Sequence, residues 1–487
     1  MATIEELRKT RLKKLEAIRK SLASPYPEKT KRTHSIEEAV RDFAKLSRLK
    51  KEVILAGRIK SQRGHGGSAF LDIEDGTAKI QAFFKKDGLG EEGYKFFSDN
   101  FDIGDFIEIR GTLFKTKKGE RTIEAAGFKM LAKSLLPLPE KWHGIQDVEE
   151  RFRKRYLDLI FNKEIKEKFI LRSKIIKELR SFMEKEGFLE VETPVLQPIY
   201  GGTEAKPFKT HLNALDINLY LRIAPELYLK RLIVGGFEKV FEIGKCFRNE
   251  GVDRSHNPDF SEMEFYWAYA DYKDMMKLIE KMMTFVVKNL FSRLEIKYEG
   301  KGINFKAPFK RIEYKTLISN FTKIDIETVN RDALFKKAKD LGVKVEEKMT
   351  KFKLADAIFK KFCLPKIWQP TFVIHHPEGS IPLAKQLDEN PKKLGSIQLV
   401  IAGLEIVKAY SELNDPIKQY ENFKEQEKLF VDGLEDAQRM DKDYVEALEY
   451  GMPPTAGFGM GIDRLVALLT NSHSLREVIL FPTMRPK

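Results

Sequence analysis

The sequence contains little cysteine and no long apolar run. Only Cys246 and Cys363 occur among its 487 residues. Two thiols cannot form a disulfide framework or a cysteine-ligated zinc site, and they are typical of a reducing cytosol. The N-terminus lacks the apolar core of a signal peptide, and no run approaches the roughly 20 apolar residues that span a bilayer. We therefore expect a cytoplasmic location and no membrane partner.

Two common nucleotide-binding motifs are also absent. The sequence has no G-x-x-x-x-G-K-[ST] phosphate loop and no strand–G-x-G-x-x-G–helix unit. Positive charge is in excess, with 87 Lys and Arg against 73 Asp and Glu, a formal net charge of +14. This excess favours a polyanionic partner, nucleic acid first, although lysine-rich surfaces also follow from genome bias. The length allows about two to four domains.

The N-terminal part changes from a helical to a strand pattern. Residues 4–22 have helical apolar spacing with many basic residues, and Pro25 and Pro27 end the pattern. From about Val53 to Leu136, five short strands separated by turns predict a small barrel of the oligonucleotide-binding type. Phe70 belongs either to the barrel core or to a face that stacks on bases. The candidate RNA contacts on the strand face are Arg63, Phe70, Gln81 and Glu120.

The stretch 241–267, FEIGKCFRNEGVDRSHNPDFSEMEFYW, organises the rest of the chain. Apolar and polar residues alternate at both of its ends, which predicts two antiparallel strands joined by a polar loop. Such a hairpin directs many polar and aromatic side chains towards one region of space. A hairpin that only faced solvent would not need this arrangement. These side chains are Arg248, Glu250, Arg254, His256, Phe260, Glu264 and Tyr266.

Three carboxylates, Glu226, Glu264 and Glu412, lie at strand ends or strand–helix junctions among apolar residues. A buried carboxylate is costly unless a cation pairs with it. The cation is either internal or a ligand, and spacing alone favours internal salt bridges. The sequence places three internal candidates nearby, Arg222, Lys230 and Lys408. A pocket without internal partners would prefer a cationic substrate.

A glycine-rich segment, MPPTAGFGMGIDR at 452–464, ends at Arg464. Glycine allows the backbone to approach a flat or charged ligand closely. Arginine stays charged and binds phosphate through paired hydrogen bonds. Together with Arg248, Arg254 and His256, this segment predicts a phosphate-binding set.

At these residues the sequence resembles the class II aminoacyl-tRNA synthetases, and specifically the bacterial-type lysyl-tRNA synthetases. The resemblance covers nearly the whole chain, through KSLLPLPEKWHG, RYLDLI, GGTEAKPF and LFPTMRP. GFLEVETPVL at 187–196 resembles class motif 1, FRNEG opens motif 2 and GMGIDR matches motif 3. RNEG indicates only the class, whereas LRIAPELYLKRL with SELNDP and E-x-Y at 264–266 is typical of the lysine family.

The resemblance implies an α+β multidomain protein that forms a homodimer, with Pro194 at the interface. An OB-fold anticodon-binding barrel is expected at 48–138, after a basic helical extension at 1–47. A linker at 139–170 precedes a catalytic domain at 171–487, an antiparallel sheet flanked by helices. The same domain is expected to carry a helical insertion at about 310–365.

The resemblance also implies lysine–tRNA ligase activity. ATP and L-lysine would form lysyl-adenylate with Mg²⁺, and the lysyl group would pass to the 3′ end of tRNA(Lys). An aspartyl or asparaginyl synthetase is the alternative within the class, but Glu264 and Glu412 make the expected side-chain pocket acidic. A paralogue that lysylates a protein would usually lack the barrel. A non-enzymatic RNA-binding regulator would not need to retain Arg248 or Arg464.

Roles for the ATP site follow from the matching positions. Arg248 is expected to hold the α-phosphate and the lysine carboxylate, and His256 and Arg464 the outer phosphates, which makes Arg248 and Arg464 the catalytic pair. Glu250 is expected to contact the adenine amino group, and Phe260 to stack on the ring.

Roles for the other two sites follow in the same way. Gly202 and Glu226 are expected to bind the lysine α-amino group, and Lys408 lies near the lysine carboxylate. Arg63, Phe70, Gln81 and Glu120 match positions that contact a U-rich anticodon. The residues expected around the lysine side chain are Glu264, Tyr266, Tyr410 and Glu412. Under the resemblance, a ligand cation becomes the preferred partner of the carboxylates.

Two positions depart from the family. Gln398 stands where a glutamate usually holds magnesium with Glu405, and Lys408 stands where asparagine is usual. A turn at Ala402-Gly403 would place Gln398 and Lys408 side by side. Our hypothesis is that the Lys408 ammonium replaces part of the work of one magnesium ion. Alternatively, Gln398 ligates the ion through its carbonyl and Lys408 points away.

Overall fold

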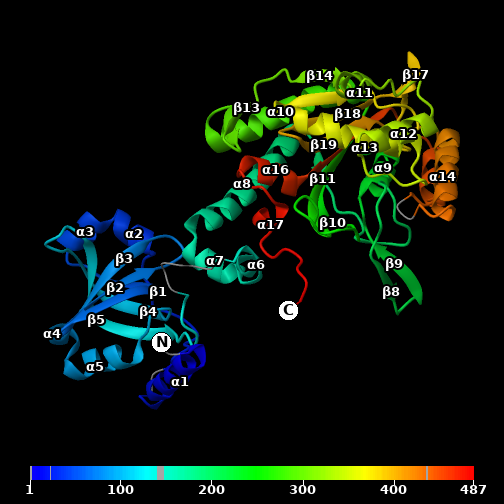
Figure 1. The fold of residues 1–487 in the computed structure, drawn as a ribbon. Helices are drawn as coiled ribbons and strands as arrows, with labels where there is room; N and C mark the ends of the chain where they lie inside the picture. Colours follow the sequence, from blue (N-terminus) through cyan, green and yellow to red (C-terminus); the bar gives the residue numbers. More distant parts are fainter. Residues whose placement is uncertain (1–2, 22–23, 140–146, 435–436, 487) are drawn as a thin grey trace. The chain divides into compact units, whose positions relative to one another are not determined.

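The computed structural model describes residues 3–21, 24–139, 147–434 and 437–486. The chain forms two compact units, residues 1–146 and 147–487 (Figure 1). Within the described ranges, no helix combines the length and apolar character needed to cross a bilayer. Part of the predicted linker, residues 140–146, lies outside the described residues.

The first unit contains the predicted barrel. Its strands close in the order β1-β2-β3-β5-β4. They are β1 (Glu52–His65), β2 (Ser68–Glu74), β3 (Lys79–Lys85), β4 (Phe106–Lys115) and β5 (Arg121–Ala132). The accompanying helices are α1 (Ile4–Lys20), α2 (Ile36–Arg41), α3 (Phe43–Arg48), α4 (Lys86–Leu89) and α5 (Glu91–Asn100). All five predicted strands and the N-terminal helix are confirmed.

Phe70 lies on the outer face of the barrel and not in its core. Along β2 the buried residues alternate with half-buried ones, and Ala69 and Leu71 enter the core. Phe70 therefore points the other way, as side chains on a strand alternate. Its ring stacks on that of Phe83, with 4.6 Å between the ring centroids.

The second unit is built on an eight-stranded sheet in the order β14-β15-β18-β19-β20-β11-β10-β6. The pairs β14–β15 and β6–β10 at its edges are parallel, and the other pairs are antiparallel. Its strands are β6 (Leu189–Glu190), β10 (Lys239–Phe247), β11 (Asp259–Ala268), β14 (Lys310–Glu313), β15 (Thr371–Ile374), β18 (Ser396–Ile401), β19 (Leu404–Ser411) and β20 (Thr455–Gly461). The predicted hairpin is β10–β11, with Phe241 opposite Phe265.

One face of this sheet packs on the main apolar core. Phe265 and Phe458 stack across β11 and β20, with 4.3 Å between ring centroids. Three helices cover this face: α8 (Lys163–Lys185), α10 (Tyr272–Phe291) and α16 (Ile462–Leu469). The opposite face is left for the polar residues of the same strands.

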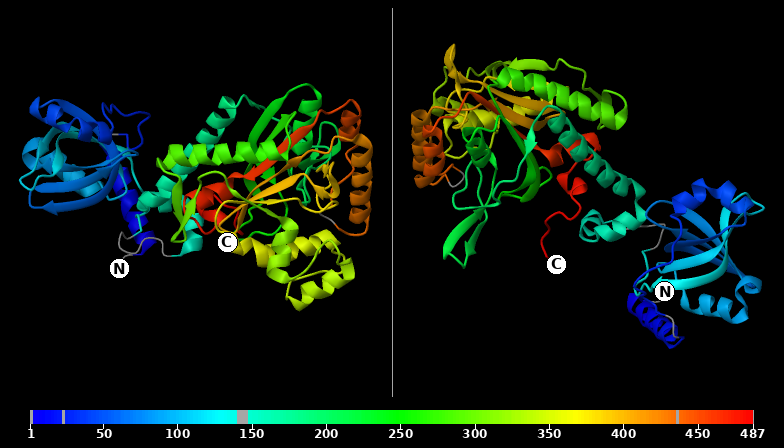
Figure 2. Two further views of the ribbon diagram at one scale, coloured as in Figure 1. Left: turned by 90° about the horizontal axis from the view of Figure 1, so that it is seen from above. Right: turned by 180° about the vertical axis from the view of Figure 1, so that it is seen from behind.

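Shorter elements surround the sheet, and α14 lies at one side of the unit (Figure 2). The helices are α6 (Val148–Arg153), α7 (Arg155–Phe161), α9 (Glu226–Val234), α14 (Pro416–Val431), α15 (Lys442–Glu449) and α17 (Leu475–Val478). The strands are β7 (Leu196–Gln197), β8 (Lys209–Leu212), β9 (Ile217–Leu221), β12 (Glu295–Tyr298), β13 (Lys301–Asn304), β16 (Gln386–Leu387) and β17 (Asn390–Leu394).

The predicted helical insertion at 310–365 begins with a strand, because β14 pairs with β15 at the sheet edge. The helical part follows as α11 (Tyr314–Thr322), α12 (Arg331–Asp340), α13 (Lys351–Ile358), the π-helix η1 (Phe359–Cys363) and the 3₁₀-helix η2 (Leu364–Lys366). The helices α11, α12 and α13 share an apolar core with η1, and Val373 and Val400 of the large sheet contribute to it. The segment therefore keeps its predicted helical character after its first four residues.

Three further segments complete the second unit. The motif 1 segment at 187–196 contains only the short strands β6 and β7, which belong to different sheets. Helices α14 and α15 follow β19 in the sequence, and residues 435–436 between them lie outside the described residues. The glycine-rich segment forms a strand, since residues 455–461 are β20, between β19 and β11.

Candidate active site

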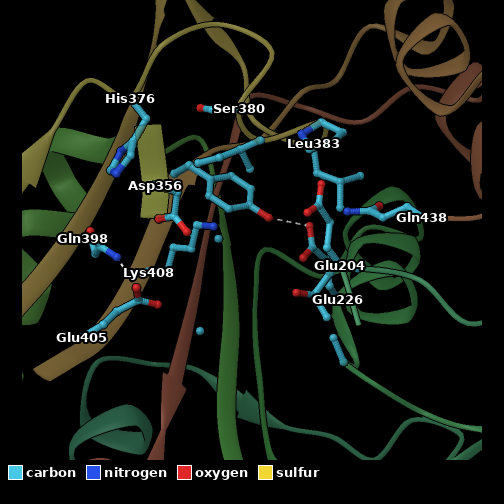
Figure 3. Close-up of a pocket in the computed structure, with 18 of the residues that line it drawn as sticks. Glu204, Glu226, Asp356, His376, Ser380, Leu383, Gln398, Glu405, Lys408 and Gln438 are labelled. Atoms are coloured by element: carbon cyan, nitrogen blue, oxygen red, sulfur yellow. Dashed lines mark hydrogen bonds between the residues drawn. The ribbon is translucent and has the colours of Figure 1, made fainter. Parts of the chain in front are cut away.

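A cavity of about 690 Å³ lies against the polar face of the large sheet. Gln398, Lys408, Gly459 and Glu264 follow one another as direct neighbours across β18, β19, β20 and β11. Directly opposed residues share a face of the sheet, so their side chains converge. Figure 3 shows Gln398, Lys408 and Glu405 at one side of this cavity and Glu226 at the other.

The middle strand β20 presents glycine to the cavity at three alternate positions. Gly457, Gly459 and Gly461 alternate with Phe458 and Met460, which are buried in the core. A Cβ on Gly457 would lie 1.8 Å from Glu412 Oε1, whereas the nearest atoms to a Cβ on Gly459 are 3.8 Å away. Gly457 therefore makes room for Glu412, and Gly459 leaves an open floor on which a flat ligand can lie.

One end of the cavity is acidic around a buried lysine. Lys230 Nζ lies 2.6 Å from Glu226 Oε1 and also forms an ion pair with Glu412. The Tyr410 hydroxyl donates to Glu226 Oε1 at 2.8 Å. Burial opposes the charge on Lys230, but the two carboxylates raise its pKa above the ordinary value. The internal salt bridges expected from the sequence thus exist for two of the three carboxylates.

The third carboxylate, Glu264, has no such partner. Among the described residues no cation forms an ion pair with it, and the Tyr266 hydroxyl donates a hydrogen bond to its Oε2 at 3.2 Å. Burial, together with Glu262 and Glu226, raises the pKa of Glu264 well above its usual range. Arg222, one of the three candidate partners, pairs with Glu242 instead. The acidic end therefore carries more carboxylates than cations and suits a cationic ligand.

Glu262 was not among the predicted site residues, although it shares the cavity-facing side of β11 with Glu264. Its Oε2 atom lies 3.8 Å from Arg248 Nη2. Burial raises the pKa of Glu262 despite the opposing effect of Arg248. The period-two alternation of the strand was the signal that could have identified it.

The opposite end of the cavity is cationic. The Arg248 guanidinium lies over the Phe260 ring, 4.8 Å from its centroid. Arg464 at the start of α16 donates from Nη1 to the carbonyl of Glu405 at 3.1 Å. Both arginines line the cavity.

The loop between β10 and β11 contributes only part of the predicted set. His256 lines the cavity, and its Nδ1 lies 3.0 Å from Asp253 Oδ1. Burial raises the pKa of Asp253, but hydrogen bonds from Ser255 and His256 lower it to about 2. Glu250 is exposed and lies outside the described cavity lining, as does Arg254.

Gly202 and the predicted metal residues also lie at this cavity. Gly202 has φ +92°, and a Cβ there would be 2.9 Å from the Cβ of Glu226. The Gln398 amide donates to the Glu405 carboxylate, while Gln398 Oε1 is buried without a hydrogen-bond partner in the described chain. The predicted turn is confirmed, with Ala402 and Gly403 both at positive φ.

The donor set at Gln398 and Glu405 is small. The described residues contain no group of three or more His, Cys, Asp or Glu arranged to hold a metal ion. One carboxylate and one unpartnered amide oxygen nevertheless fit a magnesium ion that takes its other ligands from phosphate and water. Lys408 lines the cavity beside them. His376 completes this side, and burial together with Lys408 lowers its pKa to about 3.

The four predicted RNA contacts lie on or beside the barrel strands. Arg63 on β1 is directly opposite Phe70 on β2. The Gln81 carboxamide oxygen accepts a hydrogen bond from Thr122 at 3.0 Å. Glu120 is exposed and precedes β5. Phe83 lies within β3, directly opposite Phe70, and its stacked ring extends this aromatic surface. It was missed because two adjacent phenylalanines, Phe83 and Phe84, do not show by themselves which one faces outward.

Comparison with known proteins assigns both units. A family model described as tRNA synthetases class II (D, K and N) matches residues 147–485, and one described as an OB-fold nucleic acid binding domain matches residues 53–131. The lysine–tRNA ligase of Carboxydothermus hydrogenoformans is 51% identical over 99% of both chains. That of Aquifex aeolicus is 52% identical over 89% of this chain and 73% of its own, and that of Clostridium tetani 48% over 94% and 91%. The chain therefore belongs to the lysine–tRNA ligase family of class II aminoacyl-tRNA synthetases.

Proposed function

We propose that this chain activates L-lysine with ATP and transfers the lysyl group to tRNA(Lys). The observation that carries the proposal is the acidic end of the cavity. Lys230 pairs with Glu226 and Glu412, while Glu264 remains buried without a cation among the described residues. The substrate ammonium supplies the missing charge, and an aspartate side chain would add to the imbalance.

Lysine binds along the rows of side chains that cross β19, β20 and β11. Glu264, Tyr266 and Glu412 surround its side-chain ammonium, and the Tyr410 ring packs along its alkyl chain. Gly202 and Glu226 receive the α-amino group. This placement is supported by the common lining of one cavity by all six residues.

ATP binds at the cationic end. Arg248 holds the α-phosphate and the lysine carboxylate, and His256 and Arg464 hold the outer phosphates. Phe260 stacks on the adenine, with Arg248 beside the same ring. The exposed Glu250 contacts the adenine amino group only if its loop moves inward, since it lies outside the described lining.

The reaction needs no nucleophilic side chain. The lysine carboxylate attacks the α-phosphorus of ATP in line, forming lysyl-adenylate and releasing pyrophosphate. The terminal ribose hydroxyl of the tRNA then takes the lysyl group and releases AMP. Arg248 and Arg464 neutralise charge that develops on the phosphates, and the glycine floor of β20 lets the two substrates lie in contact.

Gln398 and Glu405 would hold magnesium at the phosphate end. The ion, when bound, neutralises phosphate charge and orients the phosphate oxygens. Lys408 faces Gln398 directly across β18 and β19. Its ammonium takes over part of this neutralisation, so that fewer ions are needed at the site. A Lys408→Asn variant is expected to require more magnesium, and unchanged magnesium dependence would contradict this role.

tRNA(Lys) contacts the first unit of the chain in this proposal. The outer face of the barrel, with Arg63, Phe70, Gln81 and Glu120, binds the anticodon. Homodimer formation through residues 187–196 and a cytoplasmic location stay predictions from the sequence.

ATP–pyrophosphate exchange measured with each of the twenty amino acids tests the proposal. Exchange is expected with lysine, and Arg248→Ala is expected to lower its rate at least about a hundredfold, because a charged partner of the reacting phosphate is lost. Arg311→Ala is the matched control, since Arg311 is exposed on β14 at the edge of the sheet, outside the described lining. Exchange with aspartate alone, or wild-type exchange by Arg248→Ala, would contradict the assignment.

A further inference from the structure

The helical insertion forms one wall of the cavity. Lys353, Asp356 and Lys360 all line it, and they recur at intervals of three and four residues along α13 and η1. Residues with this spacing share one face of a helix. The insertion thus turns a charged face towards the site, although most of its apolar residues pack in a separate core. Figure 3 places Asp356 on the same side of the cavity as Gln398 and Lys408.

Lys360 belongs to the phosphate end of the cavity. Its Nζ lies 2.7 Å from Asp356 Oδ2, and 60% of its side chain is exposed, so a ligand can reach the ammonium. Partial desolvation by nearby protein atoms lowers the pKa of Lys360, but Asp356 and then Glu405 raise it, while Arg464 opposes them. The ammonium therefore lies within the electrostatic field of two groups that come from β19 and α16.

The local helix geometry brings this lysine to the cavity. The α-helix passes into a π-helical turn at Phe359, one residue before Lys360. Such single turns widen a helix and are frequent at functional sites. The next residue, Lys361, is directed elsewhere, and its ammonium donates to the carbonyl of Leu341 at 3.1 Å. Two adjacent lysines on one turn thus have different surroundings.

We propose that Lys360 is a further ATP-binding residue, which holds the outer phosphates from the insertion side of the cavity. This inference rests on the proposed function, because that function places the phosphates near Arg464 and Glu405. A lysine ammonium binds phosphate as a compact charge and can exchange partners on a flexible stem. Asp356 holds the ammonium in place before ATP arrives, and the phosphates then compete for it.

Lys360→Ala tests the inference, with Lys361→Ala as the matched control that removes the same charge one residue away. In ATP–pyrophosphate exchange, Lys360→Ala is expected to raise the KM for ATP about tenfold or more and to change the KM for lysine less than about twofold. Lys361→Ala is expected to leave both constants unchanged. Lys360→Arg should restore most of the ATP affinity, since it keeps a phosphate-binding cation.

Several outcomes would overturn the inference. They are an unchanged KM for ATP in Lys360→Ala, an equal rise in both constants, or the same effect in Lys361→Ala. If Lys360→Ala folds poorly, the same two KM values are measured for Lys360→Met, which keeps an apolar stem without the charge. Calorimetric titration with ATP gives a second measurement that does not need the reaction. A wild-type protein that exchanges with no amino acid would contradict the proposed function, whereas calorimetry would still decide whether Lys360 binds ATP.

Discussion

At the scale of single residues, the cavity keeps one carboxylate in an unfavourable state. Glu264 is buried near Glu262 and Glu226 and has no ion-pair partner in the described part of the chain; burial, together with these two carboxylates, raises its pKa. Lys230 relieves this repulsion only for Glu226 and Glu412. A ligand cation that enters beside Glu264 therefore gains the attraction that the protein leaves unsatisfied.

Glu264→Gln should separate the lysine site from the ATP site. The amide keeps the shape of the side chain but loses its charge, so the KM for lysine is expected to rise roughly tenfold to a hundredfold. The KM for ATP should change little, and the melting temperature of the unliganded protein should stay the same or increase. Steady-state exchange kinetics and calorimetry measure these quantities. Glu238→Gln, at an exposed position before β10, is the control, and equal effects of both variants would contradict the role.

Lysine binding should also depend on pH. The raised pKa of Glu264 means that the unliganded site favours the protonated carboxyl. A lysine ammonium favours the carboxylate, so binding releases a proton and the affinity increases as pH rises towards the pKa of the free site. The raised pKa also makes the stability of the unliganded protein depend on pH. The contribution of Glu264 to folding is fully present below about 4.3, the pKa of a glutamate in the unfolded chain, and it is lost as pH rises through the pKa of Glu264 in the folded protein.

Titration calorimetry in two buffers with different ionisation enthalpies measures the released proton. The wild-type protein should release protons when it binds lysine, and Glu264→Gln should release fewer. Proton uptake, or an equal release by both proteins, would contradict this assignment.

At the scale of elements, β20 shows how one strand can serve two requirements. Gly457, Gly459 and Gly461 lie at alternate positions towards the cavity, while Phe458 and Met460 anchor the strand in the core. Glycine weakens an isolated strand, but pairing with β19 and β11 on both sides holds this one. Pairing with the neighbouring strands thus offsets the stability that β20 loses by having no side chains at the cavity floor.

Two alanine variants should distinguish the glycines of β20. Gly457→Ala is expected to destabilise the fold by about 1–3 kcal/mol, because its Cβ would overlap Glu412 and the Tyr266 ring. Gly459→Ala meets only ordinary contacts at 3.8 Å, so it should melt like the wild type but raise the KM of the substrates that lie on the floor. Thermal unfolding and exchange kinetics measure both effects. Equal melting temperatures for the two variants would be inconsistent with this geometry.

At the scale of the whole molecule, the chain consists of two units with separate apolar cores. The residues proposed to bind lysine and ATP all belong to residues 147–487, and the expected anticodon contacts all belong to residues 1–146. Under the proposed function, amino-acid activation and anticodon recognition would therefore depend on different parts of the sequence.

Residues 147–487 alone should fold and catalyse lysine-dependent ATP–pyrophosphate exchange within about threefold of the full chain. Their charging of tRNA(Lys) should fall by about a hundredfold or more, because the OB-fold surface that binds unstacked bases is missing. Exchange and aminoacylation assays on the same preparation provide the comparison. Full charging activity without the first unit would contradict the role of the barrel.

The sequence by itself determined the features that depend on local periodicity and residue type. Alternation predicted the five barrel strands and the hairpin β10–β11, and motif residues such as Arg248, Glu264 and Arg464 identified the cavity. These features are local, because the period of a strand and the chemistry of a motif are contained in short segments.

The tertiary structure alone decided how distant segments share charge. Tyr410 bonds to Glu226 across 184 residues, and Lys230 divides its charge between Glu226 and Glu412. Topology likewise made the glycine-rich segment a central strand and brought Lys360 to the cavity that opens on the hairpin. The hairpin could be predicted from its own alternation, but only the fold, by placing Lys230, showed that Glu264 has no ion-pair partner within the described ranges.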